Sequence, residues 1–169
     1  EYGQGRMAEP LEIADAIEAF FKERMTGALA GKRILVTAGP THEPLDPVRF
    51  VSNRSTGKMG MALATSARDF GAEVSVVHSP LQVAVPFGVN SVPVRTAAEM
   101  RAATFDLLPS TDVLIGAAAV ADYRPATVAD QKIKKKSGSL EIELVRTPDI
   151  LGEVGAQRQQ SGRPQVMVG

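Results

Sequence analysis

The stretch RILVTAGPTHEPLDPVRFVSNRSTGKMG at residues 33–60 decides the fold of this chain. Its apolar beginning, 33–37, is typical of a buried strand. Apolar residues then recur at helical spacing ahead of a terminating Gly71, namely at Met59, Leu63, Ala67 and Phe70. The sequence therefore predicts a strand, a long irregular loop over 38–57, and a helix.

Toward the C-terminus the same alternation of strand and helix continues. Strand patterns cover 73–77, 89–94, 112–118, 141–145 and 164–168, a polar loop covers 123–139, and helices are expected at 96–108 and from Pro148. Thr96 and Glu99 form a capping box for the first of these helices. This alternation favours an α/β fold of Rossmann-like type, with a mostly parallel sheet, helices on both faces and a long loop after the first strand.

Toward the N-terminus, residues 1–9 lack any period, and Pro10 opens an amphipathic helix of about four turns. Its apolar positions are Ile13, Ile17, Phe20, Phe21 and Met25. The small residues at 27–31 then form a linker, so we place a domain boundary near Gly31.

Composition narrows the classes of partner. The 169 residues contain 19 Lys plus Arg and 19 Asp plus Glu, so the formal net charge is zero. Such a chain has no global field that attracts nucleic acid or anionic lipid. The absence of cysteine excludes disulfides, thiolate metal sites and a cysteine nucleophile. No signal peptide and no apolar run of about 20 residues is visible, so we expect a cytoplasmic domain without nucleic-acid or membrane partners.

The end of the long loop suits a phosphate. Asn53, Ser55, Gly57 and Lys58 place an amide, a hydroxyl, a glycine and a cation at the start of a helix. The pattern is not a Walker loop, because Ser52 and Met59 stand where a glycine and a serine or threonine are needed. The glycine fingerprint of dinucleotide sites is also missing after the first strand. The alternative is a structural loop that caps the helix.

Two later segments are further candidates. After the small residues 116–121, Asp122 is positioned either to hold a divalent cation or to form an ordinary turn cap. The lysine run that starts at Lys132 is either a solvated loop or a mobile loop that closes over a polyphosphate. His42 and His78 are too isolated for a zinc site. These residues favour phosphoryl or nucleotidyl transfer without a covalent nucleophile.

Three motifs in this order carry a family resemblance. Residues 37–60, AAAVADYRP at 117–125 and Lys-Ile-Lys-Lys at 132–135 resemble phosphopantothenoylcysteine synthetase of the bacterial, CTP-using type. GRMAEP at 5–10 resembles the end of the flavin-dependent decarboxylase domain that is fused upstream in bifunctional bacterial proteins. The resemblance implies that 1–30 are a linker helix and the tail of that domain, that 31–169 are the ligase domain truncated at its C-terminal end, and that FMN belongs only to the absent upstream domain.

The family implies a two-step ligation in coenzyme A biosynthesis. The carboxylate of 4′-phosphopantothenate attacks the α-phosphorus of CTP, and the amine of cysteine then displaces CMP from the acyl-cytidylate. By motif position, Asn53 holds the substrate phosphate or acyl intermediate, and Lys132 serves the first half-reaction. Arg49 is expected to reach the substrate of a partner subunit, which makes a homodimer part of the site.

The resemblance also implies the residues that bind substrate and nucleotide. Substrate binding is implied for Ala118, Ala119 and Asp122, and nucleotide binding for Gly39, Ser55, Gly57, Lys58, Lys134 and Lys135. Mg²⁺ is expected to bridge the phosphates through water and phosphate ligands, with Asp122 as the protein carboxylate considered. The residues that contact the nucleotide base are expected beyond Gly169.

Two rival functions stay open at this point. A nicotinamide-dependent Rossmann reductase shares the alternating pattern, although the glycine fingerprint and a ribose-binding acid are missing. A non-catalytic nucleotide-binding module would use the lysine run only to recruit an acidic partner. Release of pyrophosphate from CTP and phosphopantothenate distinguishes the ligase from both.

Overall fold

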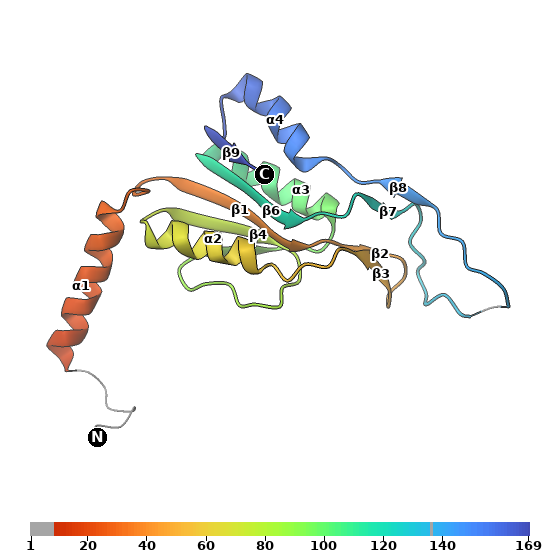
Figure 1. The fold of residues 1–169 in the computed structure, drawn as a ribbon, viewed down its shortest axis with the longest axis horizontal. Coiled ribbons are helices and arrows are strands. Elements are labelled where there is room, and N and C mark those ends of the chain that lie inside the picture. Colours follow the sequence, from red (N-terminus) through yellow and green to blue (C-terminus); the bar gives the residue numbers. More distant parts are fainter. Residues whose placement is uncertain (1–8, 136) are drawn as a thin grey trace.

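A five-stranded parallel sheet lies at the centre of the computed structural model, which describes residues 9–135 and 137–169 (Figure 1). Its strands are β1 (Arg33–Pro40), β4 (Glu73–His78), β5 (Asn90–Pro93), β6 (Val113–Ala119) and β9 (Val166–Val168). They lie in the order β5-β4-β1-β6-β9, and all neighbours are parallel. The chain reverses its direction of winding between β1 and β6, which is where ligands bind in open α/β sheets.

Helices cover both faces of the sheet, as predicted. On one face α2 (Lys58–Asp69) buries Met61 and Ala64 against Val36 and Val76. On the other face α3 (Ala97–Leu107) and α4 (Ile150–Ser161) form a second core, whose members include Leu35, Met100, Leu114 and Val154. Successive strand residues point to opposite faces, so the apolar run of β1 supplies both cores. The Rossmann-like α/β prediction is confirmed.

The start of α3 also agrees with the sequence prediction. The Thr96 hydroxyl accepts a hydrogen bond from the Glu99 N–H at 3.2 Å, and the Glu99 carboxylate accepts one from the Thr96 N–H at 3.4 Å. This is the reciprocal capping box, which satisfies two N–H groups that lack helical acceptors.

Two short antiparallel pairs correct the predicted loops. The segment 38–57 is not irregular throughout, because β1 runs on to Pro40 and β2 (His42–Pro44) pairs with β3 (Phe50–Ser52). The polar loop predicted at 123–139 begins with β7 (Tyr123–Pro125), whose partner is β8 (Leu144–Arg146). The predicted half-buried strand at 141–145 is thus shifted and largely exposed. Both pairs extend beyond the carboxyl ends of β1 and β6 (Figure 1).

The helix predicted from Pro10 is present as α1 (Pro10–Thr26) and projects away from the sheet (Figure 1). Its apolar side chains do not pack on the sheet, since Leu11 is 78% and Phe21 59% exposed. No described helix is both long and apolar enough to cross a membrane. The tail expected at 1–8 lies outside the described residues, as does the side chain of Met25. The boundary near Gly31 stays a prediction.

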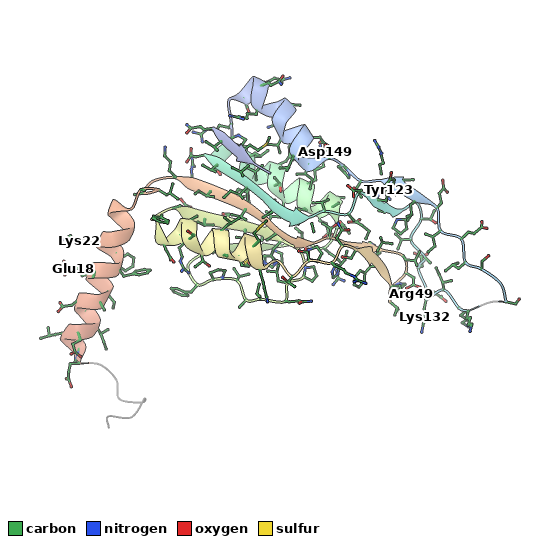
Figure 2. All side chains as sticks on the ribbon, viewed as in Figure 1. Glu18, Lys22, Arg49, Tyr123, Lys132 and Asp149 are labelled. Atoms are coloured by element: carbon green, nitrogen blue, oxygen red, sulfur yellow. The ribbon has the colours of Figure 1, made fainter. Side chains whose placement is uncertain are left out.

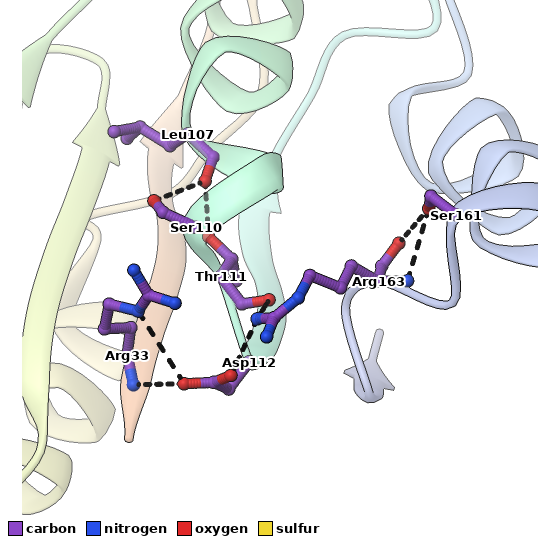
Figure 3. Close-up of polar contacts among 7 residues, drawn as sticks. All are labelled: Arg33, Leu107, Ser110, Thr111, Asp112, Ser161 and Arg163. Carbon is purple, nitrogen blue, oxygen red and sulfur yellow. Dashed lines mark hydrogen bonds and ion pairs between the residues drawn. The ribbon is translucent and has the colours of Figure 1, made fainter. Parts of the chain in front are cut away.

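Polar contacts fasten the amino ends of the central strands (Figure 3). The Asp112 carboxylate accepts a hydrogen bond from the Arg33 N–H at 2.9 Å and pairs with Arg163 Nη1 at 2.8 Å. These contacts lower the pKa of Asp112, the hydrogen bond from Arg33 having the largest effect. This end of the sheet is tied together, and the candidate ligand pockets lie at the opposite, carboxyl end.

Candidate functional site

The largest candidate pocket lies where β1 ends and α2 begins. It has a volume of about 880 Å³ and is lined by four of the predicted site residues, Asn53, Ser55, Gly57 and Lys58. Ala117 of β6 and the hairpin formed by β2 and β3 complete its wall. The pocket is therefore at the reversal point between β1 and β6.

The N-terminus of α2 is open toward this pocket. Its N-cap is Gly57, which offers no side-chain cap, and its first turn contains no acidic residue. Two hydroxyl contacts, from the Gly57 N–H to Ser55 Oγ and from the Lys58 N–H to Thr56 Oγ1, are both long at 3.4 Å. Backbone N–H groups in the first turn of a helix lack helical acceptors and favour anions. Together with the Lys58 cation, they are suited to bind an anion.

Two glycines shape the back of this pocket. Gly39 and Gly57 have φ angles of 83° and 75°, a region that side chains with a Cβ rarely adopt. A Cβ added at Gly57 would lie 2.3 Å from Leu81 Cδ2, and one added at Gly39 would lie 2.7 Å from Ser79 Oγ. Gly39 thus lies behind the lining, where a side chain would collide with Ser79 and Leu81 in the segment that follows β4.

Asn53 joins this pocket to the end of β6. Its Nδ2 donates hydrogen bonds to the carbonyl oxygens of Val120 at 3.1 Å and Ala119 at 3.4 Å. The same Ala119 oxygen accepts a hydrogen bond from the Thr41 N–H at 3.2 Å. The amide of Asn53 is therefore oriented by backbone, and its oxygen Oδ1 takes no part in these two bonds.

A second pocket of about 610 Å³ lies on the other side of β6. Ala118 and Asp122 line it, together with Tyr123, Arg146 and the N-cap of α4, Asp149 (Figure 2). Because side chains alternate along a strand, Ala117 lines the first pocket and Ala118 the second. The structure thus separates the predicted substrate residues Ala118 and Asp122 from Asn53, and it connects Ala119 to Asn53 through the backbone.

The predicted lysines lie in a third pocket. Arg49, Lys132, Lys134 and Lys135 line a volume of about 800 Å³, and the labelled side chains of Arg49 and Lys132 lie close together in Figure 2. The three lysines are exposed. Arg49, which was expected to reach a partner subunit, contacts Asp46 and the Ile133 carbonyl oxygen of its own chain.

Asp46 is a residue that sequence reasoning missed. Its side chain is fully buried, and it accepts hydrogen bonds from Arg49 and from the Ile133 N–H. The Arg49 guanidinium, more than any other contact, holds the pKa of the Asp46 carboxyl well below its usual range. An Asp-Pro pair indicates a turn, but no local signal points to a partner 87 residues away.

An aromatic pair in the first pocket was also missed. The rings of His42 and Phe50 stack with centroids 4.0 Å apart, and both line the pocket. Burial lowers the pKa of His42, Arg95 lowers it further, and Glu43 acts in the opposite direction. The pair adds an aromatic wall to the pocket.

Within the described ranges, no group of three or more His, Cys, Asp or Glu side chains could hold a metal ion. Asp122 is exposed and could supply a single carboxylate. Mg²⁺ commonly binds through one or two carboxylates plus phosphate oxygens and waters. The donor set therefore fits a magnesium ion that is shared with a phosphate ligand, and it does not form a protein cage.

Comparison with known proteins identifies a matching family and similar relatives. The family model described as "DNA/pantothenate metabolism flavoprotein C-terminal domain" matches residues 29–169. The chain is 48% identical over 158 residues to the coenzyme A biosynthesis bifunctional protein CoaBC of Vibrio cholerae serotype O1, covering 92% of this chain and 39% of that protein. It is 44% identical over 168 residues to the protein of the same name from Bacillus subtilis, covering 99% and 40%.

A solved structure is similar as well. The crystal structure of the C-terminal domain of CoaBC superposes with a TM-score of 0.70 at 46% identity, covering 79% of this chain and 62% of that chain. The chain spans about two fifths of the length of the curated relatives.

Proposed function

The chain belongs to the family of the DNA/pantothenate metabolism flavoprotein C-terminal domain, and we propose that it is a ligase of coenzyme A biosynthesis that joins 4′-phosphopantothenate to cysteine with CTP. The relatives named as coenzyme A biosynthesis bifunctional proteins support the pathway. The observation that carries the proposal is the open N-terminus of α2 beside Asn53 and Lys58, at the reversal point of the sheet.

The proposed reaction has two substitutions. A carboxylate oxygen of 4′-phosphopantothenate forms a bond to the α-phosphorus of CTP, and the bond to pyrophosphate breaks. The amine of cysteine then forms the amide bond, loses a proton and displaces CMP from the acyl carbon. Neither step needs a covalent protein nucleophile, so the chain contributes positioning and charge neutralisation.

Six of the predicted side chains have a task in this scheme. The N–H groups at the start of α2, with Lys58, hold a phosphate, and Asn53 orients the acyl intermediate. Lys132 stabilises charge that grows on the phosphates, and Lys134 and Lys135 support it. Asp122 would hold a Mg²⁺ ion through its single carboxylate, and the ion would supply further charge neutralisation to the phosphates.

Exposed apolar side chains on the hairpin of β2 and β3 and on β8 support a homodimer. Val48 is 60% and Phe50 49% exposed on the hairpin that carries Arg49, and Leu144 is 45% exposed on β8. Such a surface is suited to cover by another protein chain. A partner subunit seated there would bring its own pocket close to Arg49. We further propose a cytoplasmic location and an upstream decarboxylase domain that holds FMN, in keeping with the bifunctional relatives.

The test uses the full-length protein with CTP, Mg²⁺ and 4′-phosphopantothenate, and it measures pyrophosphate. Release of pyrophosphate, followed by release of CMP only after cysteine is added, is the expected result. Binding of CTP without pyrophosphate release would favour the non-catalytic nucleotide module instead. Oxidation or reduction of a nicotinamide cofactor without pyrophosphate would favour the reductase.

A further inference from the structure

Both oxygens of the Asp46 carboxylate accept more than one hydrogen bond. Oδ1 accepts hydrogen bonds from the backbone N–H groups of Val48 at 2.9 Å and Arg49 at 2.8 Å. Oδ2 accepts from Arg49 Nε at 3.0 Å, from Arg49 Nη2, and from the Ile133 N–H at 3.0 Å. The Asp46 side chain is 0% exposed, whereas the Arg49 side chain is 42% exposed. The buried carboxylate therefore organises both its own turn and a distant segment.

Ile133 is held at both of its backbone groups. Its N–H donates to Asp46, and its carbonyl oxygen accepts a hydrogen bond from Arg49 Nη2 at 2.9 Å. Since Arg49 is also bound to Asp46, these three residues form one closed unit, which we call the Asp46 clamp. A further hydrogen bond, from the Ala129 N–H to the Leu45 carbonyl oxygen at 3.0 Å, joins the same two segments.

The clamp lies directly beside exposed cations. Lys132 and Lys134 flank Ile133 in the sequence, and with Lys135 and Arg49 they line the same pocket. Four like charges around one volume repel each other. The Asp46 carboxylate offsets one of them, and the two bonds to Ile133 fix the backbone from which the lysines extend. This is a preorganised arrangement of charge.

We infer that Asp46 is a positioning residue. It fixes the lysine segment 132–135 beside Arg49, so that the lysine side chains are already placed to bind a polyphosphate before it arrives. This inference rests on the proposed function. Asp46 itself acts only through Arg49 and Ile133, and the ligand class is a nucleoside triphosphate whose charge the lysines neutralise.

The first test of the clamp does not depend on catalysis. Asp46→Asn keeps the size of the side chain and removes its charge, and trypsin cleavage of the Lys132–Ile133 bond is followed by mass spectrometry. The new Nδ2 cannot accept the three hydrogen bonds that Oδ2 now accepts, and the loss of even one hydrogen bond to a charged group predicts cleavage at least about tenfold faster than in the unchanged protein. Asp130→Asn is the matched control, because Asp130 is an exposed carboxylate of the same segment. Equal cleavage rates in the two variants would overturn the inference.

The second test separates positioning from general stability. In the full-length protein, Asp46→Asn is expected to lower kcat for pyrophosphate release by about 10²-fold, the cost of a misplaced catalytic group, with little change in KM for 4′-phosphopantothenate. Faster cleavage with an unchanged kcat would overturn the positioning role. If Asp46→Asn does not fold, Arg49→Gln removes the bond to the Ile133 carbonyl oxygen and must itself accelerate cleavage, or the inference fails.

The two proposals fail in different ways. An unchanged protein that releases no pyrophosphate would refute the ligase function and with it the catalytic part of this inference. The trypsin result would still decide whether Asp46 holds the lysine segment.

Discussion

Replacing Asn53 by aspartate tests the candidate site at the carboxyl end of β6, where the Asn53 side chain contacts the backbone. The change keeps the shape of the side chain and puts a carboxylate oxygen where Nδ2 now donates to Val120 at 3.1 Å and Ala119 at 3.4 Å. The hydrogen bond to Ala119 is the longer and weaker of the two. The expected loss is one neutral hydrogen bond, about 1 kcal/mol. For a chain of this length, that corresponds to a fall in Tm of about 2–4 °C.

The effect on activity is expected to be larger than the effect on stability. A carboxylate about 4 Å from a ligand phosphate costs about 4 kcal/mol at an effective dielectric constant of about 20, which is a factor of about 10³. The acyl intermediate is expected to form and to be processed poorly, so pyrophosphate release exceeds product formation. Both products are measured in the full-length protein.

A matched control shows whether an effect of Asn53→Asp comes from the position of Asn53 or from any replacement of asparagine by aspartate. Asn90, on β5, donates through Nδ2 to Ser75 Oγ at 3.1 Å. A serine hydroxyl can donate back to a carboxylate, so Asn90→Asp is expected to leave both Tm and activity near their original values. If Asn53→Asp melts at the same temperature as Asn90→Asp and forms product at the native rate, Asn53 does not belong to the site.

Three further predictions follow from other parts of the molecule. Lys132→Gln keeps the fold, because the side chain is exposed, and is expected to lower pyrophosphate release by about 10²–10³-fold; an unmodified rate would make the lysine run a solvated loop. Mixing Arg49→Ala subunits with Asn53-defective subunits is expected to restore activity in the heterodimer, where the intact Arg49 and the lysine segment that it holds enter the partner's pocket together; no recovery after verified exchange would mean that each pocket is built within one chain. Native contacts lower the pKa of Asp112, so its contribution to stability is present above the ordinary carboxyl pKa and is lost as the pH falls toward the native value. Asp112→Asn is therefore expected to lower the urea midpoint more at pH 7 than at pH 3, and an equal loss at both would contradict the assignment.

The parts of the fold that the sequence predicts well are those with local causes. The apolar run of β1 and the helical spacing of α2 each lie within a single element, and the capping box joins Thr96 to Glu99, only three positions later. The short strands β2 and β3 were not predicted, because their cause is not local. β2 and β3 contain three residues each, too few to show alternation, and they exist because they pair with each other across a turn.

The residues of the candidate site also differ in how well the sequence predicts them. Asn53 and Lys58 were found because a polar loop that ends at a helix N-terminus is visible in the sequence. Asp46 was not, because its turn and the lysine segment are far apart along the chain and meet only in the folded protein. Ala117 and Ala118 line different pockets, and this could be predicted only with the orientation of β6 in the sheet known.

The sequence by itself determined the alternation of strand and helix, the three motifs and their order, because periodicity and end signals act within one turn or one strand. Only the tertiary structure decided that Ile133 is bound by Asp46 and Arg49, which lie 87 and 84 residues away from it. Such contacts depend on how the sheet brings the carboxyl ends of β1 and β6 side by side, since hydrogen bonds form only within about 3 Å whatever the separation along the chain.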